Sequence, residues 1–216
     1  MTIEDPVEYQ IQGIAQIEVR PKSGLTFARG LRTILRSDPD VLLVGEIRDE
    51  ETARIAIQAA MTGHLVLTSL HTHNAASSIE RLKDMGVEPS LLSAAVNCII
   101  AQRLARRLCL ECRRPHLPTD DDVEDLGIPV GELPQLYEPA GCSRCSRTGY
   151  RGRVALYEVM PVQGRLRGLV RASTDEIFAA AVQEGMQTMK QDGLRLALEG
   201  VTSMSEIRRV TGDRLA

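Results

Sequence analysis

The sequence predicts an α/β fold with a largely parallel sheet and flanking helices, joined to a cysteine-rich subdomain and a C-terminal helical region. Over residues 1–108, short apolar runs typical of covered strands, at residues 41–44 and 65–70, alternate with stretches of helical periodicity. After Leu108 the chain becomes rich in Cys, Pro, Gly, Asp and Arg. The predicted domains are therefore residues 1–108, 109–153 and 154–216.

Helices in the first block are predicted from capping residues that precede periodic apolar positions. The predicted helices span residues 26–36, 49–61 and 74–85. The first must end there because the Asp38-Pro39 dipeptide leaves helical geometry. An apolar run at residues 91–104 is also predicted to be helical, with Cys98 as an inert core thiol.

The second half of the chain gives weaker signals. An acidic tract at residues 119–125 is typical of a loop, and residues 153–160 have the composition of a strand. Residues 174–198 favour helix, with breaks near Gly185 and Gly193. A Ser or Thr cap followed by an acid predicts one last short helix, which starts within residues 202–207.

Composition excludes several classes of protein. No apolar run approaches the roughly 20 residues that span a bilayer, and the N-terminus has no secretory signal, so a cytoplasmic location is expected. The net charge is −3 and the chain has no Trp, which argues against a nucleic acid partner. Two arginine clusters, at residues 103–114 and 144–153, are explained by a solvated face or, alternatively, by a nucleic-acid motor.

Three carboxylates follow strand-like segments near the start of the chain. Glu46 comes just after the apolar run 41–44, and Asp5 and Glu8 follow a second strand-like start. Strands of a parallel sheet point their carboxyl ends at a ligand crevice, where such acids can bind Mg²⁺ or activate water. The alternative for Glu46 is a glutamate that only begins a loop.

Two histidines, His64 and His71, flank the apolar run 65–70. In a strand they lie near its two ends and face opposite ways, so both cannot contact one ligand atom. Either can be a phosphate sensor or a hydrogen-bonded structural residue.

A phosphate-gripping loop with the pattern G-x-x-x-x-G-K-[ST] does not occur in this sequence. It has only three lysines, Lys22, Lys83 and Lys190, and none of them follows a glycine. Glycine amides and a lysine normally wrap and neutralise the phosphates. The chain is therefore expected not to hydrolyse a nucleotide by itself.

Four cysteines form two C-x-x-C pairs, which predicts a structural Zn²⁺ site. The candidate ligands are Cys109, Cys112, Cys142 and Cys145. Disulfides or free thiols are the alternative, but a cytoplasmic chain disfavours disulfides. Four thiolates saturate a tetrahedral ion, so this zinc is expected to stabilise the subdomain and to have no catalytic position.

These motifs together resemble the type II secretion and type IV pilus assembly ATPases, a hexamer-forming family of P-loop NTPases with a RecA-like fold. Residues 2–8 are similar to the family's aspartate box, residues 38–49 to its Walker B box and residues 62–72 to its histidine box. A tetracysteine motif after the histidine box is typical of the secretion and assembly branch. Residues 149–159 are also similar to this branch.

The resemblance implies a role for each matching residue. Glu8 corresponds to the catalytic glutamate, Glu46 to the Walker B acid near Mg²⁺, and His71 to the histidine that senses the terminal phosphate. Asp5, Arg48 and His64 are implied to support nucleotide binding. The arginines of the helix at 26–36 also match, although a solvated face or a subunit contact explains them equally.

The implied parent protein is a homo-hexamer that uses ATP and Mg²⁺ to drive pilin or pseudopilin polymerisation. It is expected at the cytoplasmic face of the inner membrane, held there by platform proteins. In the family a phosphate loop and an N-terminal domain precede the aspartate box, so this chain is expected to be a C-terminal portion of such a protein, with a partial RecA-like core. A non-catalytic, zinc-stapled module that binds a platform partner is the alternative. The motifs do not separate secretion from pilus assembly.

Overall fold

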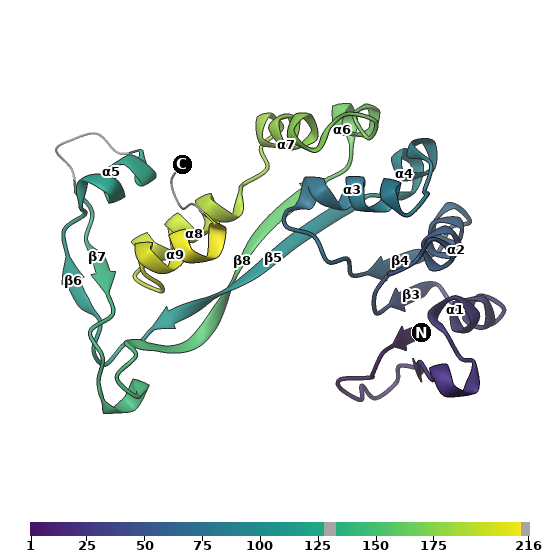
Figure 1. Ribbon diagram of the computed structural model, residues 1–216, viewed down its shortest axis with the longest axis horizontal. Helices are drawn as coiled ribbons and strands as arrows, with labels where there is room; N and C mark the ends of the chain where they lie inside the picture. The colour runs from purple at the N-terminus through teal and green to yellow at the C-terminus, as the bar shows by residue number, and fades with distance from the viewer. Residues whose placement is uncertain (128–132, 213–216) are drawn as a thin grey trace. The chain divides into compact units, whose positions relative to one another are not determined.

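The computed structural model describes residues 1–127 and 133–212, which form two compact units. Met1–Ile99 and Met160–Gln183 make the first unit, and Ile100–Val159 and Glu184–Ala216 make the second. Two long strands, β5 (Cys98–Leu108) and β8 (Tyr150–Pro161), carry the chain from one unit to the other and back (Figure 1).

A four-stranded parallel sheet is the centre of the first unit. Its order is β2-β1-β3-β4, with all three neighbouring pairs parallel. The strands are β1 (Thr2–Glu4), β2 (Gln16–Glu18), β3 (Val41–Val44) and β4 (Leu65–Thr68). Because the strands are parallel, the loops after β1, β3 and β4 all leave from the same end of the sheet, where the carboxyl ends of the strands lie. The predicted α/β fold is confirmed.

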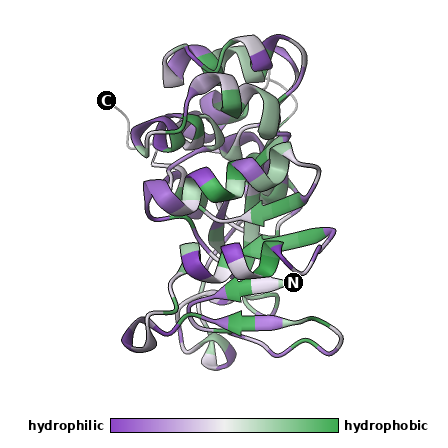
Figure 2. Ribbon diagram, turned by 90° about the vertical axis from the view of Figure 1, so that its right-hand side faces the viewer, coloured by the Kyte–Doolittle hydropathy of each residue, from purple (hydrophilic) through white to green (hydrophobic). Residues whose placement is uncertain are grey.

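Two capped helices pack beside this sheet. Thr26 caps α1 (Phe27–Leu35) and Asp49 caps α2 (Glu50–Met61), each by accepting a backbone hydrogen bond. Figure 2 shows hydrophobic residues along the strands and mixed colours along the helices, as expected of amphipathic helices with one buried face. In α1, a Cβ on Gly30 would lie 2.0 Å from Ile3 Cδ1, so only glycine allows this helix to approach β1 so closely.

Four further helices complete the first unit. They are α3 (Ala75–Asp84), α4 (Pro89–Ala95), α6 (Gly164–Gly168) and α7 (Thr174–Gln183). Asn74 caps α3 in a capping box, and Lys83 at its end donates to the carbonyl of Ala172. Ser93 of α4 donates to the carbonyl of Arg167. These contacts pack residues 160–183 against helices that come far earlier in the chain.

The second unit is built on the β5–β8 ribbon. Its described residues also form the antiparallel pair β6 (Arg114–His116) and β7 (Leu136–Glu138), the short 3-10 helix η2 (Ser143–Cys145) and the helices α5 (Asp120–Leu126), α8 (Met189–Leu198) and α9 (Met204–Thr211). A core of Ala105, Leu156, Leu196, Ile207 and Val210 joins the ribbon to α8 and α9. Arg208 of α9 pairs with Asp122 and Asp125, which ties α5 to the same core.

Three predictions from the sequence were wrong at the level of secondary structure. The run 91–104 is a helix only as far as Ala95, and Cys98 is an exposed residue that begins β5. Alternate exposed and buried residues along β5 show the two-residue period of a strand, which the apolar composition concealed. The other two corrections concern a tract that was expected to form a loop and a glycine that was expected to break a helix.

The acidic tract at 119–125 forms most of α5, because Thr119 and Asp122 make a reciprocal capping box and the acids lie in the first turn of the helix. Gly193 lies inside α8 and does not break it. A Cβ at this position would lie 2.8 Å from Ile207 Cδ1, so this glycine provides close packing between α8 and α9. In the described ranges, no helix combines the length and the hydropathy needed to cross a bilayer.

Candidate functional site

Glu46 lies just beyond the carboxyl end of β3 and is held from two sides. Its Oε1 is 2.5 Å from Nη2 of Arg48, and its Oε2 is 3.2 Å from Nε2 of His71, which follows β4. The Glu46 side chain is 12% exposed, whereas that of His71 is 88% exposed. The ends of two strands therefore bring together three of the residues predicted from the sequence, Glu46, Arg48 and His71, with the histidine open to an incoming ligand.

Ser69 fixes the geometry between these two strand ends. Its Oγ donates to the carbonyl of Gly45 at 2.6 Å, and its own carbonyl accepts from the amide of Ile47 at 3.2 Å. The two bonds hold the residues on either side of Glu46. Ser69 was not among the residues predicted from the sequence, although it lies only two residues before His71.

The electrostatics keep Glu46 ionised. The hydrogen bond from Arg48 lowers the pKa of Glu46, burial opposes this effect, and the charge of Arg48 and the bond from His71 lower the pKa further. The pKa of Arg48 is raised, chiefly by its hydrogen bond to Glu46 and by the charge of Glu46. The negative charge of Asp5, which follows β1, also favours the charged form of Arg48. An ionised carboxylate at this end of the sheet is a suitable ligand for a hard cation such as Mg²⁺.

Glu8 and His64 are not in contact with this cluster. Glu8 is exposed on the loop that leaves the carboxyl end of β1, and within residues 1–127 and 133–212 its side chain makes no hydrogen bond or ion pair. His64 precedes β4 and so lies at the opposite end of that strand from His71. Its Nδ1 lies 3.0 Å from the carbonyl of Ala59 and 3.2 Å from Oγ1 of Thr62, which gives it a local role at the end of α2.

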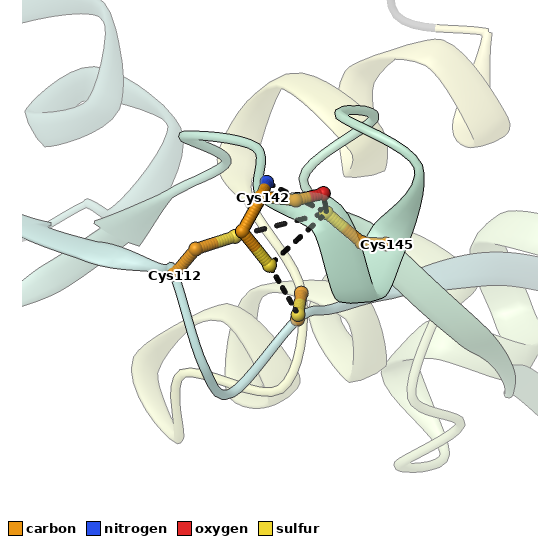
Figure 3. Close-up of side chains that lie close together, drawn as sticks. Cys112, Cys142 and Cys145 are labelled. Carbon is orange, nitrogen blue, oxygen red and sulfur yellow. Dashed lines mark hydrogen bonds between the residues drawn. The ribbon is translucent and has the colours of Figure 1, made fainter.

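The four predicted metal ligands come together in the second unit. Cys109, Cys112, Cys142 and Cys145 place their Sγ atoms within 4.8 Å of one another. Figure 3 shows Cys112, Cys142 and Cys145 converging on one point. Sulfur–sulfur distances are 3.9 Å for Cys109–Cys142, and 3.8 Å for both Cys112–Cys145 and Cys142–Cys145. A tetrahedral ion with bonds of about 2.3 Å requires edges of about 3.8 Å, so the arrangement fits Zn²⁺.

Backbone amides support this cluster. The amides of Cys142 and Gly149 donate to Sγ of Cys145 at 3.1 and 3.2 Å. Gly149 has a φ of 77° and a Cβ there would lie 2.4 Å from Cβ of Pro139, so a glycine is required at this turn. None of the five cysteines, all of which lie within the described residues, forms a disulfide.

Two of the four sulfurs, those of Cys112 and Cys145, differ in their affinity for protons. The amide of Cys142, more than any other group, lowers the pKa of the Cys145 thiol to about 6, whereas burial raises the pKa of Cys112 to about 12. One thiolate therefore forms readily at neutral pH and another does not. Binding of a cation requires that the remaining thiols lose their protons, which makes metal affinity depend on pH.

Solved structures with the same fold define the class of protein. The pilus retraction motor PilT with bound ADP covers 96% of this chain, with a TM-score of 0.68 and 29% sequence identity, and the match spans 51% of that chain. The Legionella pneumophila ATPase DotB covers 96% of this chain, with a TM-score of 0.65 and 24% identity, which supports the fold alone. The α/β unit with its polar strand ends therefore has the fold of the PilT and DotB ATPases.

Sequence comparison then gives the family. Residues 1–209 match the family described as Type II/IV secretion system protein, and the chain belongs to this family. It is 48% identical over 212 residues to type II secretion system protein E of Dickeya dadantii, covering 98% of this chain and 42% of that protein. It is 49% identical over 210 residues to the type IV pilus assembly ATPase PilB of Thermus thermophilus, covering 95% and 24%. The chain thus spans less than half the length of these relatives.

Proposed function

We propose that this chain is the C-terminal portion of a hexameric ATPase that powers type II protein secretion or type IV pilus assembly. The observation that carries the proposal is the ionised Glu46 carboxylate, held between Arg48 and His71 at the carboxyl end of a parallel sheet. Membership of the Type II/IV secretion system protein family supports it. Secretion and pilus assembly remain equal candidates, because relatives of both kinds match the chain to a similar degree.

In this proposal the strand ends divide the work of ATP hydrolysis. Mg²⁺, when bound with ATP, neutralises charge on the phosphates. Glu46 would be the carboxylate that holds the metal, and its Oε1 would then exchange Arg48 for the cation. His71 contacts the terminal phosphate with its exposed ring, and Glu8 orients the attacking water. Asp5 supports Arg48 through its charge.

The edge strand β4 suggests where a phosphate-binding loop joins the sheet. Within the described residues β4 pairs only with β3, and its Leu65 and Leu67 side chains are 53% and 47% exposed. Exposed apolar residues on an unpaired edge strand favour the addition of another strand. We infer that a strand leading into a phosphate loop occupies this edge, so that its loop meets Glu46 and His71.

Turnover measurements test the ATPase proposal. When the phosphate-loop segment is present, Glu46→Gln is expected to lower kcat by at least about a hundredfold, as loss of a major electrostatic group does. Glu80→Gln is the matched control, since Glu80 is half exposed and Lys83 is its one ion-pair partner among the residues that the structure describes. Unchanged turnover in Glu46→Gln refutes the proposal. The 216-residue chain alone is expected to show only background turnover. Turnover of that chain that Glu46→Gln abolishes contradicts this expectation.

We also propose that the four-cysteine cluster holds one structural Zn²⁺. Its four sulfurs fill the tetrahedral positions, so no position stays open for a substrate. Metal analysis of freshly purified, reduced protein is expected to give about one zinc per chain. Cys145→Ser is expected to lose the metal, whereas Cys98→Ser, the exposed cysteine outside the cluster, is expected to keep it. Reduced protein without zinc contradicts the assignment.

A second candidate function is a non-catalytic interaction module stapled by zinc. The observation that favours it is the exposed apolar surface of the ribbon in the second unit, where Ile100 is 61%, Tyr157 48% and Val159 44% exposed. Its partner is a platform protein of the inner membrane, which also places the chain at the cytoplasmic face. The double variant Ile100→Ser/Tyr157→Ser is expected to keep zinc but lose binding to such a protein, and unchanged binding rejects this role.

A further inference from the structure

The loop that carries Glu8 is long, and its apolar side chains are not buried. It connects β1 to β2 over residues 5–15, and Tyr9 and Ile11 on it are 81% and 53% exposed. Apolar packing therefore supplies little of the force that sets the loop's conformation. A residue that orients a water molecule must nevertheless be held to within a fraction of an ångström. Hydrogen bonds have to provide this order.

One side chain, that of Gln16 at the start of β2, provides three of them. Its Oε1 accepts from the amide of Ile11 at 2.7 Å. Its Nε2 donates to the carbonyl of Tyr9 at 3.0 Å and to Oε1 of Glu4 at 3.1 Å. Both hydrogens of the amide group and its oxygen are thus engaged.

These partners lie on both sides of Glu8. Glu4 ends β1 just before the loop, whereas Tyr9 and Ile11 follow Glu8. Gln16 is itself fixed by the sheet, because its backbone lies opposite Thr2 in the parallel ladder of β1 and β2. Thr2 Oγ1 also donates to the same Glu4 oxygen at 2.5 Å, which orients that carboxylate toward Gln16. The amide group of Gln16 therefore ties the backbone that follows Glu8 to the sheet, and its bond to the Glu4 side chain holds that amide in place.

We infer that Gln16 is a positioning residue, which holds the loop between β1 and β2 in one conformation and so fixes the position of Glu8. This inference rests on the proposed role of Glu8 in ATP hydrolysis. Gln16 acts through the backbone of the loop and contacts no substrate. Its loss therefore leaves nucleotide binding in place and removes the alignment of Glu8.

Three variants isolate this role. Gln16→Ala removes all three hydrogen bonds. Gln16→Glu has nearly the same shape and keeps the acceptor for the Ile11 amide, but it loses both donors and sets a second carboxylate beside Glu4. Gln12→Ala is the matched control, because Gln12 is an exposed glutamine of the same loop whose side chain has no hydrogen bond in the part of the chain that the structure describes.

The first measurement is amide hydrogen exchange in the 216-residue chain. In Gln16→Ala the Ile11 amide is expected to exchange at least about tenfold faster than in the parent sequence, since it loses its acceptor. Gln16→Glu and Gln12→Ala are expected to keep its protection. Equal protection of Ile11 in Gln16→Ala overturns the inference. Protection of the β3 and β4 amides shows whether a variant is folded, and if Gln16→Ala is not, Gln16→Glu decides in the turnover assay.

The second measurement is steady-state ATP turnover with the phosphate-loop segment present. Both Gln16 variants are expected to lower kcat by about a hundredfold, with KM for ATP changed by less than about threefold, because a small displacement of a reacting group affects chemistry more than binding. Gln12→Ala is expected to match the parent. A raised KM with an unchanged kcat overturns the inference.

Glu8→Gln in the same assay separates the two levels of the proposal. If Glu8→Gln abolishes turnover and Gln16→Ala retains it, the role of Gln16 is wrong and the ATPase proposal stands. If Glu8→Gln retains full turnover, Glu8 is not the catalytic glutamate, and both the inference and that part of the proposed mechanism are overturned.

Discussion

Replacement of Glu206 by Gln tests how the second unit is held together. The Glu206 side chain is 0% exposed and accepts hydrogen bonds from the Arg106 amide, from the Arg106 guanidinium and from Arg209, at 2.6–3.0 Å. Arg106 also lies over the ring of Tyr150, next to the metal cluster's Gly149. This one carboxylate joins β5 to α9, so its loss affects the whole unit.

The size of the effect follows from the pKa of Glu206. Burial raises this pKa, but the hydrogen bonds from Arg209 and Arg106 outweigh burial and lower it from 4.5 to about 2. That difference corresponds to about 3 kcal/mol of stability. The two arginine side chains are 47% and 57% exposed, so solvent screening reduces the expectation to about 2 kcal/mol. Because the folded pKa is depressed, this stability is present above pH 4.5 and is lost as the pH falls toward 2.

Urea unfolding followed by circular dichroism at several pH values measures this effect. At pH 7, Glu206→Gln is expected to unfold with a free energy about 2 kcal/mol lower than the parent, and the gap is expected to shrink by pH 3. Glu199→Gln, which removes a half-exposed partner of Arg195, is the control and is expected to cost less than about 0.5 kcal/mol. The reasoning is refuted if Glu206→Gln lowers the free energy of unfolding at pH 7 by less than about 0.5 kcal/mol, or if its effect does not change with pH. Comparison with the parent cancels the effect of acid on the cysteines.

Two further predictions concern the first unit, and both are read from the free energy of unfolding. Gly30→Ala is expected to destabilise the chain by about 1–2 kcal/mol, because its Cβ would overlap Ile3 in a packed core. Gly168→Ala is the control and is expected to cost nothing, because its Cβ meets nothing within 4 Å. Equal effects of the two substitutions would contradict this packing argument. Asn74→Ala is expected to cost about 1 kcal/mol, because it removes the acceptor for the Ser77 amide in the capping box of α3, and a neutral result would mean that the cap contributes no stability.

Local patterns were enough to predict the elements that surround the strand ends. Thr26, Asp49 and Asn74 each cap the helix that was expected to follow them. A cap satisfies a backbone amide two or three residues away, so its signal is contained in a short window. Prediction failed for β5, where apolar composition alone does not distinguish a buried helix from a strand.

The partners of the site residues were much less predictable. The sequence pointed to Glu46 and His71 but not to Ser69, which spans the gap between their strands, or to Gln16, which supports the Glu8 loop. An exposed serine or glutamine has no distinctive pattern of its own. Its importance depends on which distant backbone groups the fold brings within about 3 Å, the ordinary length of a hydrogen bond.

The sequence by itself determined which residue types can carry chemistry: the acids that follow apolar strands, the histidines that flank one, and the paired cysteines that suit a tetrahedral ion. Only the tertiary structure decided that His71, and not His64, meets Glu46, and that residues 160–183 return to pack with α3 and α4. The physical reason is range. Periodicity, capping and ligand spacing are properties of neighbouring residues, whereas strand order and side-chain contacts depend on how the whole chain buries its apolar surface.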